Sequence, residues 1–326
     1  MVLNNKIDAL QHIIESVILP EITGDYVLLD IPYYTNIGDT LIWEGTKSFL
    51  EKVPYKCIYS SDMHFFIEQK LEEDVVILLQ GGGNFGDIYR EHTNFRKRII
   101  NLYPNNKIII LPQSVYYEDQ ANMIEDIAFY SAYSNVIICA RDRYSYDFLS
   151  QNFNNKVLLA PDLAFFINLD NFSIRSLRKK SERGEKVLFL KRIDSEYIVN
   201  QDYNSIPYNA EIHDWPTYER TIFKLKVVDF ICRICKLISY NGDISRRNQI
   251  EDYKRDRYYR KCYVQLGIDF ISKYDVIYTT RLHVLILSIL LGKKVLIYDN
   301  QTGKIANFYS SWLSDISNVT LLNKYE

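Results

Sequence analysis

The strongest constraint on the fold is the alternation of short, β-rich apolar runs with segments of helical periodicity along the chain. Five runs in the first half are expected to be strands: residues 26–31, 55–60, 75–80, 108–113 and 136–141. Helical segments are expected at residues 39–52, 93–103, 118–133 and 143–152. Because a helical crossover returns the chain to the starting end of the sheet, successive strands run parallel. The first half therefore predicts a parallel α/β sheet.

The same alternation resumes after a charged, strand-free segment, residues 173–186, which is the expected linker. Strands are expected at 187–192, 276–280 and 294–299, and helices at 218–239, 247–273, 281–291 and 305–313. The chain is thus predicted to form two Rossmann-like α/β domains, residues 1–175 and 184–326, facing each other across a central cleft. Ligands of such proteins bind at the carboxyl ends of the strands, near the cleft.

Composition excludes several classes of protein. Glycine and proline together make up only 20 of 326 residues, which argues against collagen-like and low-complexity chains. The net charge is −2, so no global basic field indicates a nucleic-acid partner. The first twenty residues have the pattern of an amphipathic helix rather than a signal peptide. A cytoplasmic protein is expected, with peripheral contact at the inner face of the membrane left open.

The five cysteines are too few and too scattered for a disulfide scaffold. Cys232 and Cys235 form a CxxC pair, but the surrounding apolar spacing is that of a buried helix face. No second pair at zinc spacing follows, so a packing role is expected and no metal site is predicted.

A glycine cluster follows the expected strand 75–80. Gly81, Gly82, Gly83 and Gly86 place four of the twelve glycines within six residues. Glycines at a strand end let backbone N–H groups approach a phosphate or a sugar ring closely. The pattern is neither GxGxxG nor GxxxxGK[ST], so the nucleotide-binding fingerprints are absent. We expect one wall of a binding site here, the alternative being a tight turn.

The segment Asn36-Ile37-Gly38-Asp39 directly follows the first strand and precedes a helix. Asp39 is expected to cap that helix. Because this loop and the glycine cluster both follow strands of one parallel sheet, they are expected to line one cleft. A capping role alone is the alternative for Asp39.

A third motif, Thr280-Arg281-Leu282-His283, lies at a strand-to-helix junction. Thr279 or Thr280 is the expected N-cap of a helix whose start offers free N–H groups and a positive dipole end. Arg281 adds a cation, so the junction predicts an anion site. His283 is placed for proton transfer to a molecule bound there, the alternative being a structural histidine.

Further cations occur at comparable positions. Arg141 ends the expected strand 136–141 and Arg192 lies at the end of the expected strand 187–192, where each is a cleft cation or a surface ion pair. The run 246–261 holds seven basic and three acidic residues. It is expected to be a solvated helix face, with a patch for a lipid pyrophosphate or an anionic membrane as the alternative.

Together these motifs resemble the polysaccharide pyruvyl transferase family. The resemblance rests on NIGD at residues 36–39, GGGNFGD at 81–87, LPQS at 111–114, ARD at 140–142, APD at 160–162, RIDSE at 192–196, TRLH at 280–283 and TGK at 302–304. The motifs span nearly the whole chain in the family's order. One departure is Thr280, where the family commonly has an acidic residue before the RLH segment.

The resemblance implies a GT-B-like fold and transfer of the enolpyruvyl unit of phosphoenolpyruvate onto a sugar of a polysaccharide or its lipid-linked precursor. The product is a cyclic ketal, and phosphoenolpyruvate is a co-substrate in a reaction without a cofactor. The expected phosphoenolpyruvate-binding residues are Arg141, Arg281, Leu282 and His283. His283 is the expected general acid, and Asp39 is expected to orient or deprotonate an acceptor hydroxyl. The residues expected to line the acceptor side of the cleft are Asn36, Gly38, Gly81, Gly82, Gly83, Asn84, Gln113, Ser114, Arg192 and Lys304.

Two alternatives stay open at this stage. A GT-B glycosyltransferase would hold the ribose and diphosphate of a nucleotide sugar, for which Asp299 and Lys304 are the available groups. A non-catalytic carbohydrate-binding or assembly protein would not respond to phosphoenolpyruvate. The pattern makes no prediction of the oligomeric state.

Overall fold

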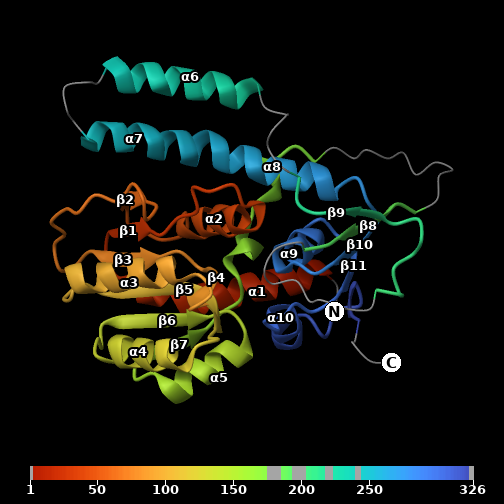
Figure 1. The fold of residues 1–326 in the computed structure, drawn as a ribbon, viewed down its shortest axis with the longest axis horizontal. Coiled ribbons are helices and arrows are strands. Elements are labelled where there is room, and N and C mark those ends of the chain that lie inside the picture. The colour runs from red at the N-terminus through yellow and green to blue at the C-terminus, as the bar shows by residue number, and fades with distance from the viewer. Residues whose placement is uncertain (1–2, 175–184, 193–202, 217–222, 239–243, 323–326) are drawn as a thin grey trace.

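The computed structural model describes residues 3–174, 185–192, 203–216, 223–238 and 244–322. The described chain contains two sheets, and every strand pair in them is parallel. The first half of the chain forms one sheet and the second half the other (Figure 1). The predicted parallel α/β architecture is thus confirmed.

The first sheet has the strand order β2-β1-β3-β5-β6-β7, with β4 paired to β5. Its strands are β1 (Tyr26–Leu29), β2 (Cys57–Ser61), β3 (Val76–Leu79), β4 (Gly82–Gly86), β5 (Ile108–Tyr116), β6 (Val136–Ala140) and β7 (Lys156–Leu159). The order reverses at β1, because β2 lies on one side of it and β3 on the other. A crevice forms at the carboxyl ends of the strands where such a reversal occurs.

Helices cover both faces of the first sheet. Leu28 contributes to the hydrophobic cluster that contains helices α1 (Leu3–Ile18) and α2 (Ile37–Leu50). Its neighbours Val27 and Leu29 contribute to the cluster of α3 (Arg90–Leu102), α4 (Gln120–Ser131) and α5 (Arg143–Asn152). Successive side chains of a strand point to opposite faces, so a strand buried on both faces is a continuous apolar run.

The second sheet has the order β12-β11-β10-β8-β9 and reverses at β8. Its strands are β8 (Val187–Leu190), β9 (Glu211–His213), β10 (Val276–Thr279), β11 (Lys294–Ile297) and β12 (Val319–Leu321). One face packs against α8 (Arg260–Ile271), α9 (Leu282–Leu290) and α10 (Lys304–Trp312). Among the described residues, the other face packs against loop side chains, including Tyr203 and Ile206.

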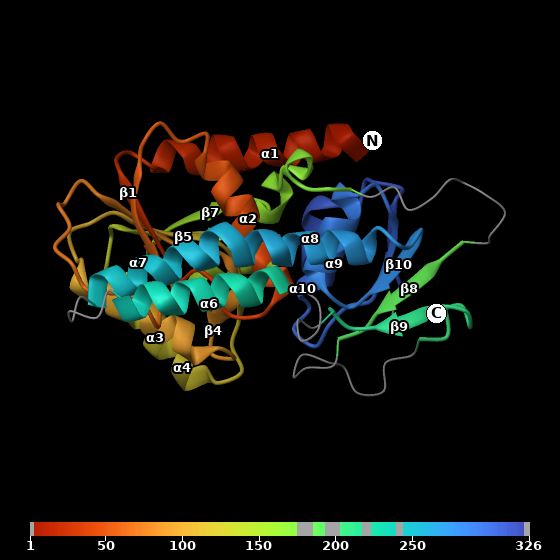
Figure 2. The same ribbon diagram turned by 90° about the horizontal axis from the view of Figure 1, so that it is seen from above.

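The two halves share a hydrophobic core. One cluster contains Leu28 and Leu78 of the first sheet together with Leu188 and Ile277 of the second. Helix α7 (Ile244–Lys254), a π-helical turn (Arg255–Tyr259) and α8 form a rod that runs over both halves (Figures 1 and 2). Most of the predicted linker, residues 175–184, lies outside the described part of the chain.

Part of the basic run 246–261 joins the halves instead of forming the solvated helix face expected from the sequence. Arg260 is buried on α8 and pairs with Glu44 of α2 and with Asp256. Burial lowers its pKa to about 10. Lys254 is also buried and pairs with Glu251. The expected single helix 247–273 is interrupted by the π-helical turn.

The helix that carries Cys232 and Cys235 is more exposed to solvent than the sequence predicted. It is α6 (Phe223–Ile238), and the apolar face expected to be buried is partly exposed to solvent. Phe230 is 65% exposed and Ile231 is 52% exposed, and Cys235 is exposed as well. Helix α6 packs against α7 and lies at the outer edge of the molecule in Figure 1.

The strands missed by the sequence analysis are β4, β7, β9 and β12. Strand β4 lies within the glycine cluster, where the sequence predicted a loop. The backbone of Gly86 has φ = +124°, and a Cβ there would lie 1.8 Å from the backbone oxygen of Tyr116. The close approach of two neighbouring strands, rather than a turn alone, therefore requires glycine at this position.

We expect Gly86→Ala to lower the free energy of unfolding by about 3 kcal/mol. Alanine would strain the backbone at this positive φ, and its Cβ would also clash with the backbone oxygen of Tyr116. Gly292→Ala is the matched control, since Gly292 also has a positive φ, +68°, but no atom within 4 Å of the added Cβ. It should cost about 1 kcal/mol. Urea unfolding of both variants measures the difference, and equal losses would contradict the packing argument.

Candidate functional site

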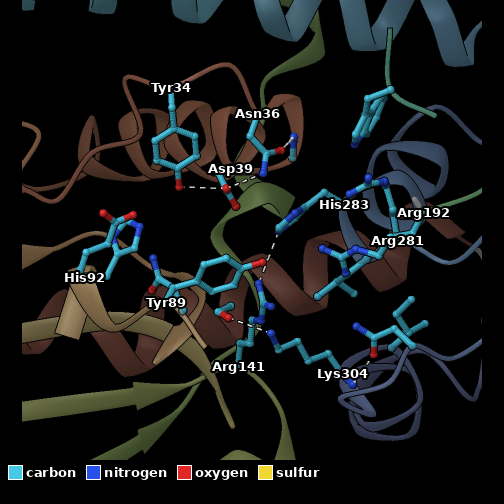
Figure 3. Close-up of a pocket in the computed structure, with 18 residues that line it drawn as sticks. Tyr34, Asn36, Asp39, Tyr89, His92, Arg141, Arg192, Arg281, His283 and Lys304 are labelled. Carbon is cyan, nitrogen blue, oxygen red and sulfur yellow. Dashed lines mark hydrogen bonds between the residues drawn. The ribbon is translucent and has the colours of Figure 1, made fainter. Parts of the chain in front are cut away.

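A cavity of about 250 Å³ lies at the carboxyl ends of strands from both sheets (Figure 3). It adjoins both points where the strand order reverses, as expected for a ligand site of parallel α/β folds. The first half lines it with Tyr34, Asn36, Gly38, Asp39, Gly83, Asn84, Tyr89, Glu91, His92 and Arg141. The second half lines it with Arg192, Trp215, Arg281, Leu282, His283, Asn300, Lys304 and Ile305.

Arg141 is held rigidly at the base of this cavity. It follows β6 directly and is 2% exposed. Its Nε donates to Ser114 Oγ at 2.9 Å, and its Nη1 donates to Asp162 Oδ2 at 2.8 Å. A guanidinium has five N–H donors in a fixed plane, so these two contacts fix its orientation while leaving an edge directed at the cavity.

The carboxylate of Asp162 connects Arg141 to His283. Asp162 is fully buried, and His283 Nε2 lies 3.5 Å from the same Oδ2 that accepts from Arg141. Burial alone would raise the pKa of Asp162, but the hydrogen bond and charge of His283 and the charge of Arg141 lower it to about 2. The carboxylate is therefore ionised near neutral pH and orients a cation and an imidazole that come from different halves of the chain.

His283 lies in the first turn of α9, directed toward Arg141 (Figure 3). A Cβ on Gly38 would be 2.8 Å from His283 Nδ1. Gly38 therefore contributes to the site by allowing this close approach of α2 to the imidazole. Leu282, beside it, lines the cavity as the first residue of α9.

Arg281 forms a bidentate ion pair with Asp214. Both its Nε and its Nη2 lie 2.7 Å from the Asp214 carboxylate, which fixes the plane of the guanidinium at the cavity wall. Asp214 lies 67 residues from Arg281 in sequence. The motif at residues 280–283, which has Thr280 where an acidic residue was expected, therefore gave no sign of this carboxylate. Arg281 itself occupies the N-cap position of α9, where the sequence predicted Thr279 or Thr280. The hydroxyl of Thr279 accepts from the Arg281 backbone N–H.

Two more cations of the second half line the cavity. Lys304 is buried at the start of α10, and its Nζ donates to the backbone oxygen of Gly83 at 2.8 Å. A Cβ on Gly83 would lie 2.9 Å from Arg141 Nη2 and 3.4 Å from Lys304 Nζ. Glycine at this position thus makes room for both cations. Arg192 follows β8, where its backbone N–H donates to Thr280 Oγ1.

Asp39 lies on the first-half side of the cavity but does not cap α2. The cap is Asn36, whose Oδ1 accepts from the backbone N–H of Gly38 at 2.8 Å. Asp39 Oδ2 instead accepts from Asn36 Nδ2 and from the hydroxyl of Tyr34 (Figure 3). Its carboxylate is therefore held in one position in the cavity, ready to accept from a further hydroxyl.

The sequence analysis missed His92, which lines the cavity at the first turn of α3. Its Nδ1 lies 2.8 Å from Asp30 Oδ1, and Asp30 is buried and has a left-handed backbone with φ = +62°. Arg96 also donates to Asp30. Because a carboxylate accepts only, a neutral His92 is protonated on Nδ1 and keeps Nε2 as an acceptor. No local signal links residues 62 positions apart.

Four residues predicted to line the acceptor side do not line this cavity. Gly81 packs against the backbone of Pro112, and Gly82 faces Ile42. Gln113 is fully buried, where it donates to the backbone oxygen of Gln80. Ser114 accepts from Arg141 and donates to Asp142. The sequence motifs predicted the correct region for these residues, but the side chains of Gln113 and Ser114 lie behind the cavity wall and support it.

Most of the cavity residues fall within one recognised sequence pattern. The pattern of the polysaccharide pyruvyl transferase family matches residues 36–302, more than half of the chain. The chain belongs to this family. The match begins at Asn36 and includes Arg141, Arg281 and His283. In this polysaccharide pyruvyl transferase family member, residues within the matched segment therefore line the cavity from both halves of the chain.

Several proteins of known sequence or structure are similar over nearly the whole chain. EpsO of Bacillus subtilis is 31% identical over 92% of this chain and 88% of its own. Pyruvyl transferase 1 of Schizosaccharomyces pombe is 28% identical over 88% of this chain and 69% of its own. A crystal structure of a Klebsiella pneumoniae protein has a TM-score of 0.62 over 98% of this chain and 99% of that one. At 21% identity this last likeness shows the fold alone.

We expect Asp162→Asn to lower the free energy of unfolding by about 3 kcal/mol at pH 7, since it leaves the buried Arg141 without a counter-charge. The folded-state pKa of Asp162, about 2, lies below the ordinary value of 3.8. The stabilisation is therefore present above about pH 5 and is lost as the pH falls toward 2.

Urea unfolding of both proteins at several pH values tests this expectation. The difference in free energy should be constant between about pH 7 and pH 5 and should shrink below about pH 4. Asp147→Asn, at an exposed position of α5, is the matched control and should show no difference. A difference that stays constant down to pH 3 would contradict the role of the Asp162 carboxylate.

Proposed function

We propose that this protein transfers the enolpyruvyl unit of phosphoenolpyruvate onto a sugar of a polysaccharide or of its lipid-linked precursor, where it forms a pyruvyl ketal. The observation that carries the proposal is the convergence of four cationic side chains, Arg141, Arg192, Arg281 and Lys304, on one small cavity. Among the residues that the structure describes, two carboxylates, Asp39 and Glu91, line the same cavity, and two more, Asp162 and Asp214, pair with Arg141 and Arg281. Guanidinium and ammonium groups held in fixed positions around one cavity suit a small substrate that carries both a phosphate and a carboxylate.

His283 is the proposed general acid. In the reaction a proton is added to the methylene carbon, which becomes a methyl group, and positive charge develops at C2. A sugar hydroxyl attacks C2 and the C–O bond to phosphate breaks, and a second hydroxyl closes the ketal ring. The two hydroxyl protons balance the proton gained by carbon and the proton taken up by phosphate. The ionised Asp162 beside His283 supports the protonated imidazole that the first step needs.

The acceptor sugar is proposed to lie at the first-half end of the cavity. Figure 3 shows Tyr34, Asp39 and His92 across the cavity from Arg192 and Arg281. The Asp39 carboxylate is held to accept from a hydroxyl. His92 is oriented by Asp30 with Nε2 as a proton acceptor, the arrangement used by general bases. We therefore assign proton removal to His92 and hydroxyl positioning to Asp39.

The nucleotide-sugar alternative is less well supported by the geometry. Asp299, its proposed ribose ligand, does not line the cavity. The Asp299 carboxylate accepts from the backbone N–H groups of Asn300 and Ala306 at the start of α10.

We expect phosphoenolpyruvate to raise the melting temperature of the protein, because a ligand that binds only the native state stabilises it by about 2.7 kcal/mol at 100 times its dissociation constant. Arg281→Gln should abolish most of this shift. Arg143→Gln, an exposed position on α5, is the matched control and should preserve it. Differential scanning fluorimetry measures each variant against its own ligand-free form. A shift with a nucleotide sugar and none with phosphoenolpyruvate would overturn the proposal.

We expect His283→Gln to lower kcat by about 10²- to 10⁴-fold, the usual contribution of a general acid. The neutral amide retains much of the volume of the imidazole but cannot deliver the proton. Phosphate release from phosphoenolpyruvate, measured with a panel of sugar acceptors, reports the rate. His64→Gln, at an exposed position, should leave the rate unchanged. Near-normal turnover by His283→Gln would remove the residue from the acid role.

A further inference from the structure

Helix α6 presents a stripe of apolar side chains to solvent. Val227, Phe230, Ile231 and Ile234 are 40%, 65%, 52% and 40% exposed, and their spacing places them on one side of the helix. Fully burying one apolar side chain of this kind contributes about 1.5–3 kcal/mol of favourable free energy. Covering a stripe of four would therefore contribute substantially to the free energy of binding. Scattered single exposed apolar residues need no explanation, but a contiguous stripe indicates an interaction site.

The catalytic cavity does not account for this stripe. No side chain of α6 that the structure describes lines that cavity. The helix packs on α7, and an apolar groove of about 360 Å³ between them is lined by Ile231, Cys232, Ile250 and Tyr253 among others. Figure 1 shows α6 and α7 as an outer layer of the molecule, with α6 on the outer side of α7.

Charge identifies the kind of partner that this stripe fits. The sequence of α6 contains four basic residues and one acidic residue, a net charge of +3, whereas the whole chain has a net charge of −2. A helix that combines an apolar face with a surplus of lysine and arginine is typical of segments that lie at the surface of an anionic bilayer. Each basic residue near such a surface adds to the attraction, and the apolar side chains enter the headgroup region.

A second copy of the chain fits this surface less well. Pairing two α6 helices would bring two net charges of +3 together. Four side chains also offer far less area than the roughly 1,200 Å² that specific interfaces bury. In addition, no helix within the described ranges is long and apolar enough to cross a bilayer, so a bilayer contact by α6 would be peripheral.

We propose that helix α6 docks the protein on an anionic lipid surface, with Val227, Phe230, Ile231 and Ile234 inserted among the headgroups. The docking does not rest on the proposed reaction, because it uses a surface outside the catalytic cavity. It places the enzyme at the membrane, where a lipid-linked saccharide would be available to it.

Flotation of the full-length protein with vesicles tests the proposal. We expect it to float with vesicles of 70% phosphatidylcholine and 30% phosphatidylglycerol and to float much less with pure phosphatidylcholine. Raising the salt concentration should weaken the anionic binding, because salt screens surface charge. The double variant Phe230→Glu/Ile231→Glu should bind the anionic vesicles at least about tenfold more weakly, since it removes apolar insertion and adds negative charge.

Ile124→Glu is the matched control, because Ile124 is 58% exposed on α4, away from α6. It should bind the vesicles as the wild type does. Circular dichroism and the phosphoenolpyruvate-dependent melting shift confirm that each variant is folded, independently of vesicle binding. The proposal is overturned if the wild type does not float with anionic vesicles, or if the double variant floats equally well. It is also overturned if the wild type is a dimer and the double variant a monomer, because a second copy would then cover α6.

Discussion

The site depends on one buried carboxylate. Asp162 is fully buried between the two halves of the chain, and its Oδ2 lies 2.8 Å from Arg141 and 3.5 Å from His283. A buried charge is costly unless it is paired, so its partners are held in place as strictly as the carboxylate itself. The result is a cation and an imidazole fixed beside each other although 142 residues separate them in the sequence. The same arrangement supplies both substrate binding and proton transfer in the proposed reaction.

The architecture explains why these groups face one another. Both sheets reverse their strand order at the first strand of the half, and the cavity is lined by residues that follow those strands, such as Asn36 after β1 and Arg192 after β8, and by residues that follow other strands of the same sheets. A shared hydrophobic core and the buried pair of Arg260 with Glu44 hold the two edges together. Direct contacts also cross the site, because Lys304 donates to Gly83 and Trp312 donates to the backbone oxygen of Arg141. The cavity is thus bounded by a packed interface between the halves.

Elements with a strong local pattern were predictable from the sequence. The runs at β1, β3, β6 and β10 are buried on both faces, so they are continuously apolar and stand out. Strands β9 and β12 have only three residues each, and β4 is formed largely of glycine, so pairing with neighbours rather than composition makes them strands. The apolar spacing of α6 led to the prediction that its apolar face is buried. Spacing indicates that a helix has an apolar face, but it does not indicate whether another element covers that face.

The sequence by itself determined the parallel α/β class, the position of the polar motifs after strands, and the placement of Arg141, Arg281 and His283 at strand ends or strand-to-helix junctions. It determined these because strand periodicity, strand-to-helix junctions and residue type are local properties. Only the tertiary structure decided that Asp214 pairs with Arg281, that Asp30 orients His92, and that Gln113 and Ser114 lie behind the wall. Those pairings join residues tens of positions apart, and they follow from how the strands and loops of each half pack together, which no local pattern encodes.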